Sequence, residues 1–164
     1  MADKATVERA LNELVGRLRD GFGDRLVSVA LYGSWARGDA RTDSDVDLLI
    51  VLRDPPQGRF ARDREVFPVL RQAEERLAET AGNDGVPVIS AIVKSVDEAS
   101  YHSPLYLDMV EDAVLLEDKD GFLNGIFGEI RVNLDRLGAR RIRFGDGWYW
   151  DLKPDYVFGD VIEI

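Results

Sequence analysis

The sequence contains no cysteine, only four lysines and a single histidine among its 164 residues. The lack of cysteine excludes disulfide bonds, thiolate metal sites and cysteine nucleophiles, and it fits a reducing compartment. No apolar run approaches the roughly 18 residues that a membrane-spanning helix needs. The first residues are charged and amphipathic, without the apolar core of a signal peptide. We therefore expect a cytoplasmic protein that does not enter a membrane.

Positive charge is also scarce, and the formal net charge is -10 with a pI of about 4.6. An acidic surface repels nucleic acid at long range, which argues against a long polynucleotide as substrate. The hydrophobic content of 45% is typical of a folded globular protein. The length predicts one domain over residues 1–164, with a core at about 5–117 and a C-terminal helix and β-like tail at about 118–164.

The hydrophobic pattern predicts an alternation of helices and strands. Helical spacing of apolar residues predicts helices over 4–22, 60–80, part of 97–112 and 121–138, with Pro68 able to kink or restart the second. Apolar, β-branched runs predict strands over 26–32, 46–52 and 86–93 and a short piece at 114–116. A Gly-Asp-Gly turn at 145–147 separates two β-like segments. This order predicts an α/β (α+β) fold, in which a small mixed sheet packs against helices.

Two aspartates, Asp45 and Asp47, stand where the strand at 46–52 begins. Side chains two residues apart on a strand share a face, so both carboxylates could reach one or two cations between them. Aspartate is disfavoured in strands and like charges on one face repel, which suggests a compensating Mg²⁺ or Mn²⁺. The alternative is that the two acids cap a strand beside a surface loop.

A second feature precedes this pair, where the strand at 26–32 ends in Gly33-Ser34. Free N–H groups at a glycine turn that opens a helix form a cradle for phosphate, and the Ser34 hydroxyl adds a donor. Arg37, one turn later, is either a phosphate partner or one half of an ion pair with Asp39 or Asp43. A phosphate cradle beside a carboxylate pair is what metal-assisted nucleotidyl transfer requires.

The segment resembles the minimal, stand-alone nucleotidyltransferases of the DNA polymerase β-like superfamily, including small archaeal members. Their pattern is Gly-Ser, ten residues and Asp-x-Asp, and here Gly33-Ser34 is followed by ten residues and Asp45-Val46-Asp47. The resemblance implies that Asp45 and Asp47 are catalytic metal ligands and that Gly33 and Ser34 hold the triphosphate. Family members commonly carry a third acid on the next strand. The strand at 86–93 has none, and Ser90 is its nearest polar candidate.

The resemblance implies transfer of a nucleoside monophosphate, expected to be AMP from ATP, to an acceptor hydroxyl. Relatives that are paired with small helical toxin-like proteins suggest a protein tyrosine as acceptor, while other relatives modify small molecules such as aminoglycosides. The missing acid supports an alternative, a catalytically weak nucleotide-binding module that acts on a partner as an antitoxin. The sequence is also compatible with a homo-oligomer.

Three features outside this segment have alternative interpretations. The aromatic residues Trp148–Trp150 are expected in a packed hairpin or an oligomer contact rather than in a base-stacking platform. The basic patch of Arg140, Arg141 and Arg143 could bind a partner or neighbouring acids. The lone His102 is expected to start a helix rather than to act as a base.

Overall fold

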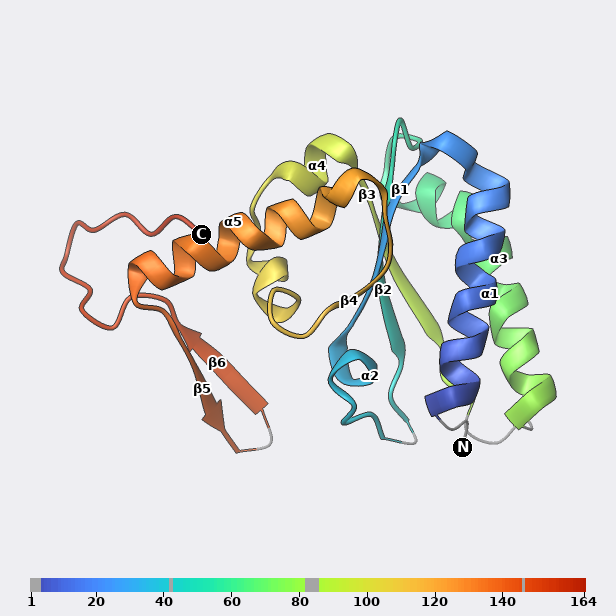
Figure 1. The fold of residues 1–164 in the computed structure, drawn as a ribbon, viewed down its shortest axis with the longest axis horizontal. Helices are drawn as coiled ribbons and strands as arrows, with labels where there is room; N and C mark the ends of the chain where they lie inside the picture. The colour runs from blue at the N-terminus through green and yellow to red at the C-terminus, as the bar shows by residue number, and fades with distance from the viewer. Residues whose placement is uncertain (1–3, 42, 82–85, 146) are drawn as a thin grey trace.

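A four-stranded sheet forms the centre of the computed structural model, which describes residues 4–41, 43–81, 86–145 and 147–164. The strands are β1 (Leu26–Tyr32), β2 (Val46–Leu52), β3 (Ile89–Ser95) and β4 (Val114–Asp118), in the order β3-β2-β1-β4. β1 runs antiparallel to β2 and β4, whereas β2 and β3 are parallel. The expected mixed sheet packed against helices is confirmed (Figure 1).

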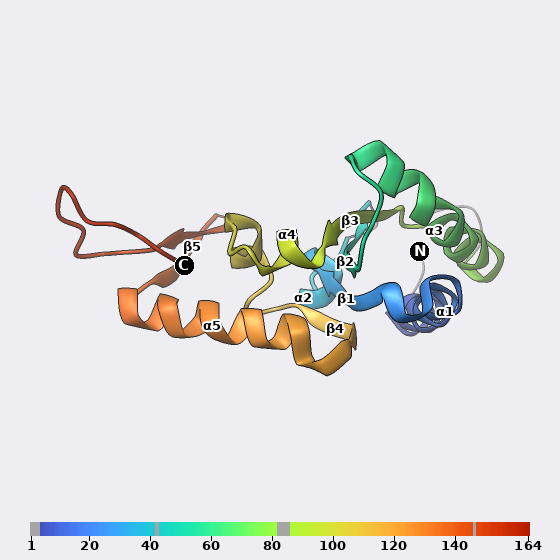
Figure 2. The same ribbon diagram turned by 90° about the horizontal axis from the view of Figure 1, so that it is seen from above.

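Helices cover both faces of this sheet (Figures 1 and 2). One face packs against α1 (Lys4–Phe22) and α3 (Arg59–Ala81). The other packs against α4 (Val96–Ser100), the 3-10 helix η2 (Pro104–Asp108) and α5 (Phe122–Leu137). Two further 3-10 turns, η1 (Gly23–Arg25) and η3 (Lys119–Gly121), precede β1 and α5.

The sequence pattern explains why the sheet is covered on both sides. Six of the seven residues of β2 are buried, because its alternate side chains point into two separate apolar clusters. Leu48 and Ile50 pack towards α1 and α3, and Leu49 and Val51 towards α5. α1 contributes its predicted stripe of buried residues, with Leu14 and Leu18 fully buried. Each such leucine stabilises the fold by roughly 1.5–3 kcal/mol.

Two predicted boundaries are wrong. The helix expected within 97–112 is instead the two short helices α4 and η2, since Pro104 stands at the N1/N2 position of a new helix. The Tyr106 hydroxyl of η2 donates to the Ala99 carbonyl of α4 at 2.6 Å and so holds the two short helices together. The third strand spans Ile89–Ser95 rather than 86–93. Pro68 lies inside α3 without dividing it.

Two small elements position the candidate site. The five-residue helix α2 (Gly33–Arg37) follows β1 directly. The strands β5 (Arg140–Phe144) and β6 (Gly147–Asp151) form the expected hairpin, which lies on the α5 side of the central sheet in both views (Figures 1 and 2). Throughout the described ranges, no helix has both the length and the apolar character that crossing a bilayer would require.

Candidate active site

The carboxylate of Asp47 lies in a row of polar side chains that crosses three strands. Asp47 pairs with Tyr32 of β1 on one side and with Ser90 of β3 on the other. Residues in register on neighbouring strands point to the same face of a sheet. This face also carries Ala30 and Leu49, which pack towards α5. Ser90 is exposed and, because it is in register with Asp47, stands next to it. This is the position at which family members commonly carry a third acid.

The Gly33 turn lies directly against Asp47. Gly33 has a φ of +73°, and a Cβ added to it would sit 2.5 Å from Oδ2 of Asp47. Such a distance is far inside van der Waals contact, so any larger residue at this turn would have to displace the carboxylate. The structure thus brings the predicted phosphate cradle and the predicted metal ligand together, and the Ser34 side chain follows at the start of α2.

Asp45 precedes β2 instead of opening it, because the strand begins at Val46. Even so, the two acids remain within electrostatic reach of each other. Burial raises the pKa of the Asp47 carboxyl, the negative charge of Asp45 raises it further, and Arg37 opposes the shift. A partly buried carboxylate that a neighbouring exposed carboxylate repels is an arrangement that a cation would relieve.

The donor set around Asp47 fits a magnesium ion that is shared with a substrate. Within the described ranges, no group of three or more histidine or acidic side chains is placed to hold a metal by itself. Mg²⁺ is commonly bound by one or two carboxylates together with substrate phosphates. Asp45 and Asp47 would supply the carboxylates, and the Gly33-Ser34 turn lies beside Asp47.

Trp35 fixes the loop that leads to Asp45. Its indole is buried, and Nε1 donates to the Ser44 carbonyl at 3.2 Å. The backbone N–H of Arg41 donates to the Ser44 hydroxyl at 2.8 Å. α2 and the residue before Asp45 are therefore tied together, a role that the sequence analysis did not assign to Trp35.

Of the two interpretations of Arg37, the ion pair is observed in the structure. The Nε of Arg37 lies 3.3 Å from Oδ2 of Asp39. Its guanidinium also lies 4.3 Å from the ring centroid of Trp148, on the C-terminal hairpin. The positive charge nevertheless acts on Asp47, whose pKa it lowers against the effects of burial and of Asp45.

Tyr32 and Asp108 are additional residues of this face that the sequence analysis missed. Burial raises the pKa of Tyr32 to about 12, with further contributions from the carboxylates of Asp47 and Asp108. Tyr32 is thus a neutral hydroxyl donor at physiological pH. It precedes Gly33 within the motif, so its position was a usable signal. Asp108 belongs to η2, and only the tertiary fold shows that it lies near Tyr32.

The other features make contacts with neighbouring elements in the described part of the chain. Trp150 Nε1 donates to the Leu107 carbonyl at 3.1 Å, so the aromatic residues belong to a packed hairpin as expected. Arg141 pairs with Glu111 and Asp112, which are neighbouring acids. His102 lies one residue before the N-cap of η2, and its Nδ1 is 2.7 Å from the Ile164 carbonyl oxygen.

Comparison with known proteins identifies this arrangement. The family model described as a nucleotidyltransferase domain matches residues 11–99, which are 89 of the 164 residues. The chain belongs to this family. It is therefore a nucleotidyltransferase, an enzyme that transfers a nucleoside monophosphate. The matched residues of the nucleotidyltransferase domain end within α4 and leave β4, α5 and the hairpin outside.

Individual relatives are similar over most of the chain. The "Putative protein adenylyltransferase MJ1305" of Methanocaldococcus jannaschii is 28% identical over 136 residues, which cover 82% of this chain and 88% of the relative. A crystal structure of a putative nucleotidyltransferase from Sulfolobus solfataricus is 24% identical, with a TM-score of 0.45 and coverage of 68% of this chain and 80% of that one. A chain from the complex of the tri-AMPylated Shewanella oneidensis HEPN toxin with its MNT antitoxin is 15% identical, with a TM-score of 0.43 and coverage of 80% and 92%.

Proposed function

We propose that this nucleotidyltransferase transfers AMP from ATP to a hydroxyl group of a partner protein, with a tyrosine of a toxin-like protein as the first candidate. The acceptor oxygen forms a bond to the α-phosphorus, and the bond from that phosphorus to the bridging oxygen of the β-phosphate breaks. Pyrophosphate leaves. The observation that supports the proposal best is the close approach of the Gly33 turn to the Asp47 carboxylate, because phosphates bound at this turn would then lie beside a carboxylate that can hold a cation.

Each residue of the site has a defined part in this proposal. The Gly33-Ser34 turn binds the β- and γ-phosphates through its N–H groups and the Ser34 hydroxyl. Asp45 and Asp47 hold the divalent cation, which, when bound, neutralises the charge that develops on the phosphates. Arg37 adds positive charge beside the polyphosphate. Tyr32, whose pKa is raised to about 12, offers a protonated hydroxyl as a hydrogen-bond donor on the same face.

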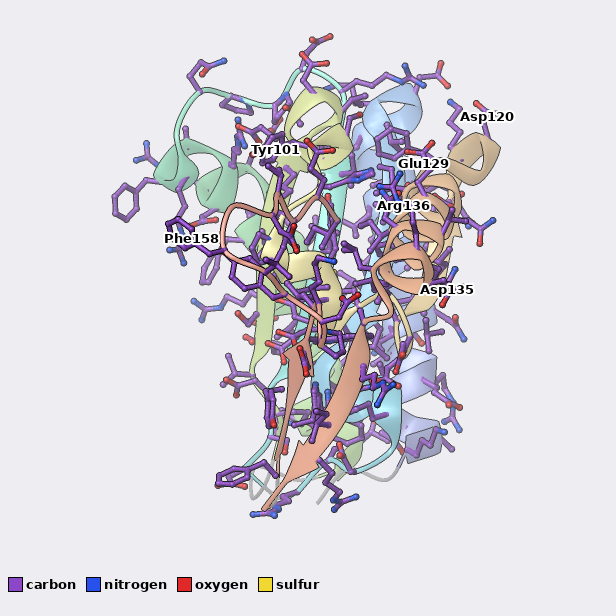
Figure 3. The ribbon with its side chains drawn as sticks, turned by 90° about the vertical axis from the view of Figure 1, so that its left-hand side faces the viewer. Tyr101, Asp120, Glu129, Asp135, Arg136 and Phe158 are labelled. Atoms are coloured by element: carbon purple, nitrogen blue, oxygen red, sulfur yellow. The ribbon has the colours of Figure 1, made fainter. Side chains whose placement is uncertain are left out.

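Two observations support a protein as the acceptor. The archaeal relative that covers most of the chain carries the name of a protein adenylyltransferase. Large apolar side chains are also exposed around the C-terminal tail, and Figure 3 shows Tyr101 and Phe158 at the surface on this side of the molecule. Exposed apolar patches commonly mark protein–protein contacts. Phe144, Tyr149, Tyr156, Val157 and Val161 are further exposed members of this set.

The first prediction concerns the divalent cation. We expect ATP to bind at least about tenfold more tightly with Mg²⁺ than with EDTA, because without a cation the triphosphate faces two carboxylates. Calorimetric titration of ATP under both conditions measures this difference. Radiolabelled ATP, carrying the label on the α-phosphate, then reports transfer to candidate acceptor proteins. Equal affinity with Mg²⁺ and with EDTA would contradict the metal-bridged site.

A second candidate function is a nucleotide-binding module with weak catalysis that acts by binding its partner. The observation that favours it is Ser90, which stands in register with Asp47 but is neither charged nor a base at neutral pH. General-base catalysis typically contributes about 10²–10⁴-fold, so its absence would leave slow transfer. Turnover of labelled ATP, compared with binding alone, separates the two functions.

Ser90→Asp is therefore a gain-of-function test. The new carboxylate would lie beside Asp47 on the exposed face, so we expect metal binding to tighten by about tenfold and transfer to accelerate. Ser90→Asn, which has nearly the same shape without the charge, is the matched control. Mn²⁺ titration and single-turnover transfer provide the measurements. An aspartate variant no better than the asparagine variant would place the missing group elsewhere, with Asp108 as the next carboxylate to replace.

A further inference from the structure

The C-terminal hairpin presents one face to the site and the other to solvent. Register pairs Trp148 with Arg143 and Trp150 with Arg141, so these four side chains share a face. Tyr149 and Phe144 lie on the opposite face and are more than half exposed. The hairpin lies outside residues 11–99, so the family match says nothing about what its inner face does.

This inner face is anchored to the rest of the protein at two points. Trp150 Nε1 donates to the Leu107 carbonyl at 3.1 Å, just before the end of η2. Arg141 donates to Glu111 at 2.9 Å and to Asp112 at 2.6 Å. Those bonds fix the hairpin beside the segment that covers the Asp47 face of the sheet. Trp148, two residues before Trp150, is thereby held against Arg37 of α2.

Two guanidinium groups lie against the Trp148 ring, but only one is available to a phosphate. The Arg141 guanidinium is 4.0 Å from the ring centroid, and Glu111 and Asp112 already neutralise its charge. The Arg37 guanidinium is 4.3 Å from the centroid and, among the residues that the structure describes, is paired with Asp39, whose side chain is 59% exposed. An ion pair at 3.3 Å with a partner as exposed as Asp39 orients an arginine weakly. The Trp148 ring is therefore the main constraint on Arg37.

We infer that Trp148 is a positioning residue for the nucleotide site: the hairpin uses its indole to hold the Arg37 guanidinium beside the Gly33-Ser34 turn, ready for the polyphosphate. This inference rests on the proposed function and assigns a part of it to a segment that the family match leaves out. Cation–π contact restricts the arginine without neutralising it, so its charge remains free for phosphate oxygens. Arg37 belongs to the same short helix that Gly33 and Ser34 open, so α2 carries both the turn and the guanidinium.

The experiment compares variants of Trp148 in the full chain, with MgATP as the probe. Trp148→Leu keeps an apolar side chain in the hairpin but removes the aromatic face, and we expect it to weaken MgATP binding by about three- to tenfold. Trp148→Phe should recover most of the affinity. Tyr149→Ala, on the solvent face of the hairpin, is the matched control and should bind as the wild type does. Thermal unfolding and circular dichroism check each fold.

A double-mutant cycle with Arg37→Ala distinguishes positioning from a merely structural role. If Trp148 acts through Arg37, Trp148→Leu will cause no further loss of MgATP affinity in the Arg37→Ala background. Wild-type affinity in Trp148→Leu, or an equal loss with and without Arg37, would overturn the inference while leaving the proposed function in place. A wild-type protein that binds no MgATP would overturn the proposed function, and the inference with it.

Discussion

Replacing Asp47 with asparagine is expected to abolish detectable nucleotidyl transfer without unfolding the protein. The variant keeps the shape of the side chain beside Gly33 but loses the charge that would hold the cation. Asp45→Asn should act in the same direction. Asp43→Asn removes an equal charge from the exposed loop two residues before Asp45 and serves as the matched control. Labelled-ATP transfer, with calorimetry of MgATP binding, measures the effect.

The stability of the same variant carries independent information. Because burial and Asp45 raise the pKa of Asp47 in the folded protein, ionisation of this carboxyl opposes folding. The wild type should therefore lose stability as the pH rises from below the ordinary aspartate pKa to above the raised pKa that Asp47 has in the folded protein. Asp47→Asn should lack this loss, so without metal its melting temperature at neutral pH will equal or exceed that of the wild type. A strongly destabilised variant that retains transfer would show that Asp47 is structural.

Gly33→Ala is expected to reduce MgATP affinity by about tenfold or more, because the new methyl group must displace the Asp47 carboxylate. An alanine Cβ at this position would lie 2.5 Å from Oδ2 of Asp47. Gly38→Ala is a closely matched control, since Gly38 also has a positive φ, of +80°, but nothing lies within 4 Å of its added Cβ.

Both alanine variants should lose about 1–2 kcal/mol of stability from left-handed backbone strain. Only Gly33→Ala should also lose nucleotide affinity. Chemical denaturation and MgATP calorimetry on the pair separate the two effects. Equal affinity in the two variants would mean that the phosphate cradle is not at this turn.

The parts of the fold that the sequence predicted well are those with strong local patterns. The helix over 4–22 and the strands over 26–32 and 46–52 have the predicted bounds, because apolar spacing and short buried runs determine them locally. The segment 97–112 was misjudged because its apolar residues suited one helix, whereas Pro104 and the bond from Tyr106 to Ala99 divide it. β3 begins later than predicted, since an apolar run does not reveal where pairing with β2 starts.

The candidate site also has a part that local sequence predicts and a part that it does not. The Gly33-Ser34 turn and the two aspartates lie within fifteen residues, so their spacing was enough to predict that they meet. The contact of Arg37 with Trp148 joins residues more than a hundred positions apart. The effect of Asp108 on Tyr32 likewise depends on how η2 packs over the sheet. Neither leaves a periodic or spacing signal, and both required the tertiary structure.

The hydrogen bond from Trp35 to Ser44 has a consequence for the entropy of nucleotide binding. Trp35 lies between the phosphate turn and Arg37, and Ser44 immediately precedes the first carboxylate, so one indole couples both halves of the site. A loop held in this way loses its conformational freedom when the chain folds and not when a ligand arrives. In the proposed site the nucleotide would therefore meet a loop that is already ordered, and its binding free energy would not be reduced by having to order that loop. Weakening the hydrogen bond from Trp35 to Ser44 would lower nucleotide affinity through loss of preorganisation, although Trp35 need not contact the nucleotide.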